Sequence, residues 1–225
     1  MTEEAVQMHR LNTPINQRDP GSYVVRILLQ ELRSYYSAPI SGVYLLPNKD
    51  DVLQWDGLMV CREGLYSGGF FCFTITFPVE YPSTTFTVHF KTRVFHPLVD
   101  TDDGRFNFLG CESFRNWNPD TFHVFDLCRH MKEAFADVSI VDDNFVANKA
   151  SFSLFQDDRP SFSSIARTTS DESKDQMYDV DSLFAFKMIP QKDVSKLRRV
   201  LRRGCNPDST LQVQDTLTTL FNTFK

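Results

Sequence analysis

The central segment FKTRVFHPLVDTDDGRFNFLGC, residues 90–111, holds side chains that could carry out chemistry. A His96–Pro97 pair opens it, an acidic turn leads to Gly104, and Cys111 closes it. A cysteine thiolate can attack an acyl carbon, and a histidine can hold or move a proton. A nucleophilic role for Cys111 is therefore the first hypothesis to weigh.

The spacing of the histidines and cysteines does not favour a metal site. Cys128 and His130 are two residues apart on an expected helix and point to different faces. His123 and His130 could share a face, but no second ligand pair accompanies them. Because the sequence also lacks C-x-x-C pairs, Gly-rich phosphate loops and a Ser/His/Asp spacing, we expect no metal and no cofactor.

Length and charge limit the class of protein. The 225 residues suffice for one substantial domain with appendages. A formal charge of −5 argues against a general nucleic-acid binder, so no nucleic-acid partner is expected. The start of the chain does not resemble a signal peptide, and no stretch approaches the roughly 18 apolar residues of a membrane span. We therefore expect a cytoplasmic protein without a transmembrane segment.

The elements that must position the central segment begin with a helix. Residues 1–21 are polar and are expected to form a mobile arm. From Ser22, a possible N-cap, apolar residues recur at three- and four-residue spacing, and the helix should stop before Pro39. The recurring residues are Val24, Ile27, Leu28, Leu32 and Tyr35.

Four strand-like runs follow, separated by turn residues. They read GVYLLP, VLQWDGLMVCR, FFCFTITFP and TFTVHF. In the third run Phe73 and Ile75 alternate with Cys72 and Thr74, which is the period of a strand with one buried face. Short connections predict an antiparallel meander, and we expect the opening helix to cover its buried face.

Helices are expected after the central segment. One begins near Thr121, and residues 144–167 form a second helical stretch. The charged run TTSDESKDQ, residues 168–176, is interpreted as the edge of the domain. The predicted organisation is an arm over 1–21, a domain over 22–168 and a C-terminal extension over 169–225.

Two candidate helices occupy the extension. The first combines an apolar face with a basic one, and the second has a short seam spaced like a coiled coil. Packing on the domain itself and docking of a partner both stay open for these helices. The candidate partner-binding residues are Leu197, Leu201, Val213, Leu217, Leu220 and Phe224.

The order of elements and several motifs together resemble the ubiquitin-conjugating enzymes. LYSGGFFCFTITFPVEYP is similar to the family signature through Tyr66, Gly68, Gly69, Pro78, Tyr81 and Pro82. VHFKTRVFHP resembles the strand that leads into the family's His-Pro-Asn motif, and Trp117 with Pro119 resembles its Trp-Ser-Pro. The resemblance covers roughly residues 22–168 and implies an α+β fold: an N-terminal helix, a four-stranded meander and C-terminal helices.

The chain departs from what this resemblance requires for catalysis. Active members carry an asparagine directly after His-Pro, and a cysteine soon after the next glycine. Here Leu98 follows Pro97, and the nucleophile position falls on Asn107, with Cys111 four residues later. Leucine cannot donate a hydrogen bond and a carboxamide cannot form a thioester, so we expect no catalytic residue.

The string VFHPLVD, from Val94 to Asp100 through Leu98 and Val99, narrows the resemblance. It is most similar to the Fused Toes (Akt-interacting protein) family of non-catalytic variants, as are Gly42-Val43-Tyr44 and Gly64-Leu65-Tyr66. The resemblance implies an adaptor that binds Hook-type coiled-coil proteins and a Hook-interacting protein. Such complexes link vesicles to dynein and microtubules, which implies a peripheral location on vesicles or an association with microtubules.

Two alternatives stay open at this point. The protein could be an atypical active conjugating enzyme that uses Cys111. It could also be a ubiquitin-binding variant that partners an active conjugating enzyme. In either case His96 is expected to order its own loop through hydrogen bonds to the backbone.

Overall fold

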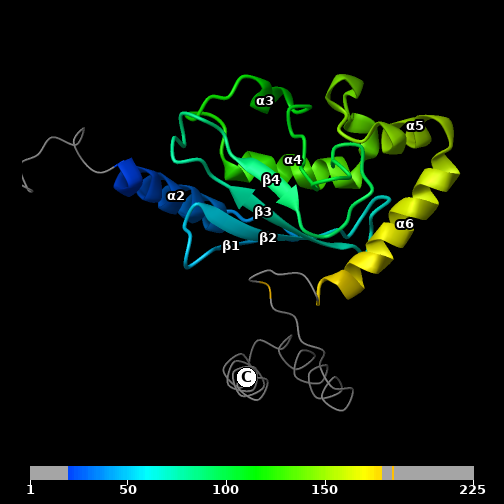
Figure 1. Ribbon diagram of the computed structural model, residues 1–225, viewed down its shortest axis with the longest axis horizontal. Helices are drawn as coiled ribbons and strands as arrows, with labels where there is room; N and C mark the ends of the chain where they lie inside the picture. The colour runs from blue at the N-terminus through cyan, green and yellow to red at the C-terminus, as the bar shows by residue number, and fades with distance from the viewer. Residues whose placement is uncertain (1–19, 179–183, 185–225) are drawn as a thin grey trace, which may run out of the picture. The chain divides into compact units, whose positions relative to one another are not determined.

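The computed structural model describes residues 20–178 and 184 (Figure 1). Most of the expected N-terminal arm lies outside these residues. So do both candidate helices of the extension, with Leu197, Leu201, Val213, Leu217, Leu220 and Phe224.

The predicted four-stranded meander is confirmed. The strands are β1 (Val43–Pro47), β2 (Gln54–Val60), β3 (Phe70–Thr76) and β4 (Thr87–Phe90), antiparallel in the order β1-β2-β3-β4. In the register, Gly57 lies opposite Phe73. A Cβ atom at Gly57 would lie 2.1 Å from the Phe73 ring, so only glycine leaves room for this ring.

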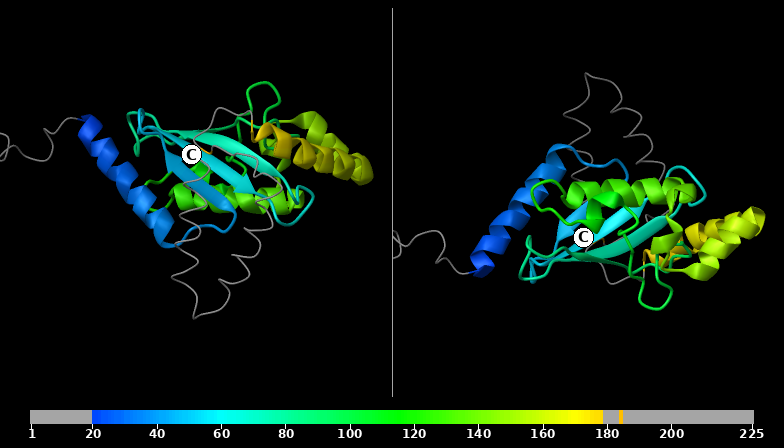
Figure 2. Two further views of the ribbon diagram at one scale, coloured as in Figure 1. Left: turned by 90° about the horizontal axis from the view of Figure 1, so that it is seen from below. Right: turned by 90° about the horizontal axis from the view of Figure 1, so that it is seen from above.

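The helix that covers the inner face of the sheet is α4 (Val124–Ala136), not the opening helix as expected (Figure 2). Phe135 of α4 packs on the rings of Phe71 and Phe90, with centroids 5.3 and 5.4 Å apart. The apolar stripe of α4 is fully buried, so α4 contributes more side chains to the core than α2 does.

The opening helix α2 (Pro20–Ser37) lies beside the edge strand β1. Tyr35 and Tyr36 donate hydrogen bonds from their hydroxyls to the carbonyls of Val43 and Leu45, at 3.0 and 2.6 Å. These bonds occupy carbonyls on the open edge of the sheet. The helix thus closes the sheet edge in addition to contributing Val24 and Leu28 to the core.

The helical stretch expected over 144–167 is two helices, α5 (Lys149–Asp157) and α6 (Arg159–Gln176). Asp158 separates them because its carboxylate accepts a hydrogen bond from the Ser161 N–H, as an N-cap does, and Pro160 fits the first turn. The run TTSDESKDQ, interpreted as the edge of the domain, is the second half of α6. It is held there by Ser173, whose buried hydroxyl accepts the Phe70 N–H at 2.8 Å.

Candidate functional site

His96 anchors the loop that follows β4. Its Nδ1 accepts the Leu98 N–H at 3.0 Å, so Nε2 carries the proton that it donates to the Ala134 carbonyl at 3.1 Å. The ring stacks on Phe135, with centroids 4.4 Å apart and planes 8° apart. Burial lowers the pKa of His96 to about 4, so the imidazole is neutral at pH 7. Both of its nitrogens are engaged with backbone.

Pro97 and Leu98 fix the start of this loop. The Pro97 carbonyl accepts hydrogen bonds from the backbone N–H groups of Ala147 and Asn148, each at 2.9 Å. The Leu98 side chain is 1% exposed and belongs to the core. The residue at the position where the resemblance places the oxyanion donor therefore fills apolar space, and its side chain has no polar group.

The chain then turns back on itself. A bridge pairs Val99 with Phe106, and the Asp100 carboxylate accepts the Asp102 N–H in the turn between them. Gly104 has a φ of +74°, and a Cβ there would lie 2.4 Å from the Phe90 carbonyl oxygen. This tight turn delivers Asn107, whose N–H bonds the Leu98 carbonyl at 2.7 Å.

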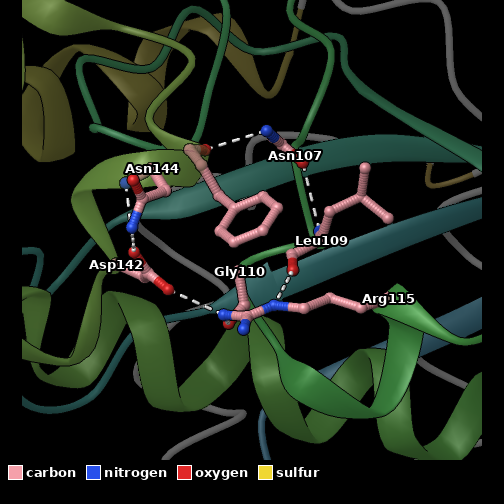
Figure 3. A network of polar contacts seen from close by, with 7 residues as sticks. Asn107, Leu109, Gly110, Arg115, Asp142 and Asn144 are labelled. Atoms are coloured by element: carbon pink, nitrogen blue, oxygen red, sulfur yellow. Dashed lines mark hydrogen bonds and ion pairs between the residues drawn. The ribbon is translucent and has the colours of Figure 1, made fainter.

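The Asn107 side chain is engaged at both ends (Figure 3). Its Nδ2 donates to the Phe145 carbonyl at 2.8 Å, and its Oδ1 accepts the Leu109 N–H at 3.1 Å. A carboxamide cannot form a thioester, and here it joins two loops that lie far apart in the sequence. The Asn107 side chain therefore has a structural role, which is to connect these two loops, at the position where the resemblance places a nucleophile.

Arg115 reinforces the same junction (Figure 3). Its guanidinium donates to the carbonyls of Leu109 and Gly110 at 3.1 and 3.2 Å and to the Asp142 carboxylate at 2.7 Å. It also lies over the Phe145 ring, 4.3 Å from the centroid. We call the set Asn107, Arg115, Asp142 and Phe145 the loop clamp.

Asp142 is held in its charged form. Its carboxylate accepts hydrogen bonds from the backbone N–H and the side chain of Asn144, at 3.0 and 2.8 Å. These bonds, and secondarily the charge of Arg115, hold the pKa of Asp142 below its usual range. The ion pair of the clamp is therefore present at neutral pH.

Cys111 lies just outside the clamp. It occupies the N-cap position of α3 (Glu112–Arg115), and its side chain makes no capping hydrogen bond. The residue is partly buried and packs against the core. Within residues 20–178, no base is hydrogen-bonded to its thiol.

The remaining motif residues hold the neighbouring loops. The Trp117 indole donates to the Pro82 carbonyl at 2.7 Å, and its ring lies 6.1 Å from that of Tyr81. The Tyr81–Pro82 peptide bond is cis, and Pro119 is partly buried in the turn before α4. These residues position the irregular segment around the clamp.

Sequence patterns single out one member of the loop clamp, Asn107, and none of the other three. His96, Pro97, Leu98 and Asn107 were singled out by their order along the chain, whereas Arg115, Asp142 and Phe145 were not. Asp142 with Asn144 carries the signal of an Asx turn, but that signal says nothing about a distant arginine. The described ranges contain no group of three or more His, Cys, Asp or Glu that could hold a metal ion.

Comparison with known families gives the class of this fold and site. Residues 27–170 match the family model described as ubiquitin-conjugating enzyme. This match covers more than half of the sequence, so the chain belongs to the ubiquitin-conjugating enzyme family. Among the residues that the structure describes, no helix is long and apolar enough to cross a membrane.

Individual relatives narrow the class further. A protein crossbronx homolog of Anopheles gambiae is 28% identical over 158 residues, which cover 68% of each chain. One of Culex quinquefasciatus is 30% identical over 60% of this chain and 59% of the relative. The AKT-interacting protein of Danio rerio is 30% identical over 53% of this chain, and the match spans 41% of that relative. The chain is thus a ubiquitin-conjugating enzyme variant of the Fused Toes type.

Proposed function

We propose that this protein is a non-catalytic member of the ubiquitin-conjugating enzyme family that acts as an adaptor. The observation that carries the proposal is the Asn107 carboxamide, which is bonded to Phe145 and Leu109 at the position where the resemblance places the nucleophile. Leu98, buried where the resemblance places the oxyanion donor, supports it independently. Loss of both groups leaves no route for thioester formation followed by transfer at this site.

The adaptor is proposed to bind a Hook-type coiled-coil protein and a Hook-interacting protein. In such a complex it would link vesicles to dynein and microtubule transport from the cytoplasmic side. Two similarities support this role: the VFHPLVD segment resembles the Fused Toes family, and the chain is similar to the crossbronx and AKT-interacting relatives. The name of the Danio rerio relative also describes it as a protein that interacts with another protein.

Affinity purification tests the adaptor role. The full chain, tagged in its native cells, is expected to retrieve a Hook-type protein and a Hook-interacting protein in mass spectrometry. The comparison variants are Leu98→Asn and Asn107→Cys, which restore the family's residue types. Both variants should retrieve the same partners as the wild type. A full-length tagged protein that brings down neither partner would contradict the role.

One observation favours the enzyme alternative. Among the cysteines in the described ranges, Cys111 alone is not fully buried, whereas Cys61, Cys72 and Cys128 are. Burial raises the pKa of the Cys61 thiol to about 12, which removes that thiol from consideration as a nucleophile. An active protein would therefore have to use Cys111, which makes this alternative open to a direct test.

A further inference from the structure

Helix α2 carries a stripe of exposed side chains along one side. Arg26, Leu29, Arg33 and Tyr36 follow one another at spacings of three, four and three residues, which places them along one side of the helix. Leu29 is 51% exposed and Tyr36 is 52% exposed. The spacing is the one with which a helix presents a seam to a second helix.

The stripe continues onto strand β1. The Tyr36 hydroxyl bonds the Leu45 carbonyl, which fixes its ring at the edge of the sheet. Tyr44 and Leu46 alternate with buried Val43 and Leu45, so they occupy the outer face of β1, where they are 47% and 37% exposed. We name Arg26, Leu29, Arg33, Tyr36, Tyr44 and Leu46 the α2–β1 surface.

This surface is positively charged. Glu31 is the one acidic residue of α2, and it is buried, where it accepts hydrogen bonds from Tyr81 and the Val124 N–H. Within the described ranges, neither Arg26 nor Arg33 forms an ion pair, and Arg26 lies over the Tyr23 ring at 5.6 Å. Tyrosine and arginine are enriched in binding hot spots, and here two exposed tyrosines, Tyr36 and Tyr44, lie on the same surface as these two arginines.

We propose that the α2–β1 surface docks an acidic amphipathic helix of a coiled-coil partner. The partner's apolar residues would pack on Leu29 and Tyr36, and its carboxylates would pair with Arg26 and Arg33. Strand addition is disfavoured because the two tyrosine hydroxyls occupy carbonyls on the β1 edge. The proposal rests on the proposed adaptor function and assigns the surface through which the adaptor binds.

Binding of the purified C-terminal region of a Hook-type protein to the full chain tests the assignment. Leu29→Asp/Arg33→Glu is expected to raise the dissociation constant at least about thirtyfold, because it removes an apolar anchor and repels the partner's carboxylates. Arg26→Glu/Arg33→Glu keeps every apolar group and should weaken binding at least about tenfold, more so at low salt. The matched control is Ile165→Asp/Arg167→Glu, exposed residues of α6, which should bind like the wild type.

The outcomes separate the two proposals. If the wild-type protein does not bind the Hook-type region, both the adaptor role and this surface are contradicted. Wild-type binding that survives both α2 variants, or that fails equally in the α6 control, would overturn the surface and leave the adaptor role standing. A wild-type dimer that becomes monomeric in the α2 variants would reassign the surface to self-association and also overturn the proposal. Circular dichroism confirms that each variant is folded.

Discussion

At the scale of one residue, Leu98 is part of the core at the position where the resemblance places an oxyanion donor. Its isobutyl group has nearly the outline of an asparagine side chain but contains no donor. At 1% exposure, an unpartnered amide at this position would cost about 1–3 kcal/mol of desolvation. The apolar residue therefore suits the structure of this loop, while the asparagine of active members suits their chemistry.

Arg115 gives a prediction about the loop clamp. Arg115→Ala removes bonds to Leu109, Gly110 and Asp142 and should lower the free energy of unfolding by about 1–2 kcal/mol. In hydrogen exchange, the amides of residues 107–115 should exchange faster than in the wild type. Arg129→Ala is the matched control, because Arg129 forms an ion pair with Asp126 and lies near the Phe125 ring, without bonding another loop. Equal exchange in the two variants would contradict the clamp.

The buried histidines give a prediction about pH. Burial lowers the pKa of both His96 and His130 to about 4, below the ordinary value of 6.5. The unfolded chain therefore binds more protons between these values, so the contribution of the two histidines to stability should be fully present above about pH 7 and be lost as the pH drops from 6.5 to 4. Between pH 6.5 and 4 the free energy of unfolding should fall by on the order of 3 kcal/mol per histidine.

Urea unfolding at a series of pH values measures this dependence. His130→Leu should roughly halve the loss between pH 6.5 and 4, since it removes one of the two groups. At pH 7 this variant should be about as stable as the wild type, because His130 Nε2 has no hydrogen-bond partner there. A wild-type stability that stays flat down to pH 4.5 would show that these pKa values are not lowered.

At the scale of elements, Glu31 joins three parts of the fold. From α2 it accepts hydrogen bonds from Tyr81 in the loop after β3, and from His123 and the Val124 N–H at the start of α4, at 2.8, 2.9 and 3.2 Å. A carboxylate at a helix N-terminus also opposes the positive end of the helix dipole. This contact fixes how α2 sits against α4.

Replacement of Glu31 should therefore cost more than a surface charge does. Glu31→Ala leaves a buried hydroxyl and a helix N–H without their acceptor and should lower the free energy of unfolding by about 2–4 kcal/mol. Thermal and urea unfolding measure the change. Glu133→Ala, an exposed residue of α4, is the control and should change stability by less than about 0.5 kcal/mol. Similar losses in both variants would refute a joining role for Glu31.

Patterns along the chain predicted some elements and not others. The strands were predictable because Phe73 and Ile75 alternate with Cys72 and Thr74, which is local information. The second half of α6 was not, because a run of Ser, Thr and charged residues reads as solvated chain. In the structure the buried hydroxyls of Ser170 and Ser173 are satisfied by backbone carbonyls of the helix, and Ser173 accepts the Phe70 N–H, which ties this half of α6 to β3. Such pairings appear only once the chain is folded.

The same distinction holds for the molecule as a whole. The order of motifs was sufficient to predict the conjugating-enzyme fold. The assignment of Asn107 and Leu98 to the nucleophile and oxyanion-donor positions stays a prediction. The closure of the site by Arg115 and Phe145 was beyond prediction, because their contact joins loops 30 residues apart without any periodic pattern.

A thioester-charging assay tests the central claim most directly. The full-length protein, its Cys111→Ser variant and an active conjugating enzyme as positive control are incubated with activating enzyme, ATP and ubiquitin, and resolved with and without reductant. We predict that the positive control acquires a reducible ubiquitin adduct and that neither form of this protein does. A reducible adduct on the wild type that disappears in Cys111→Ser would contradict the account.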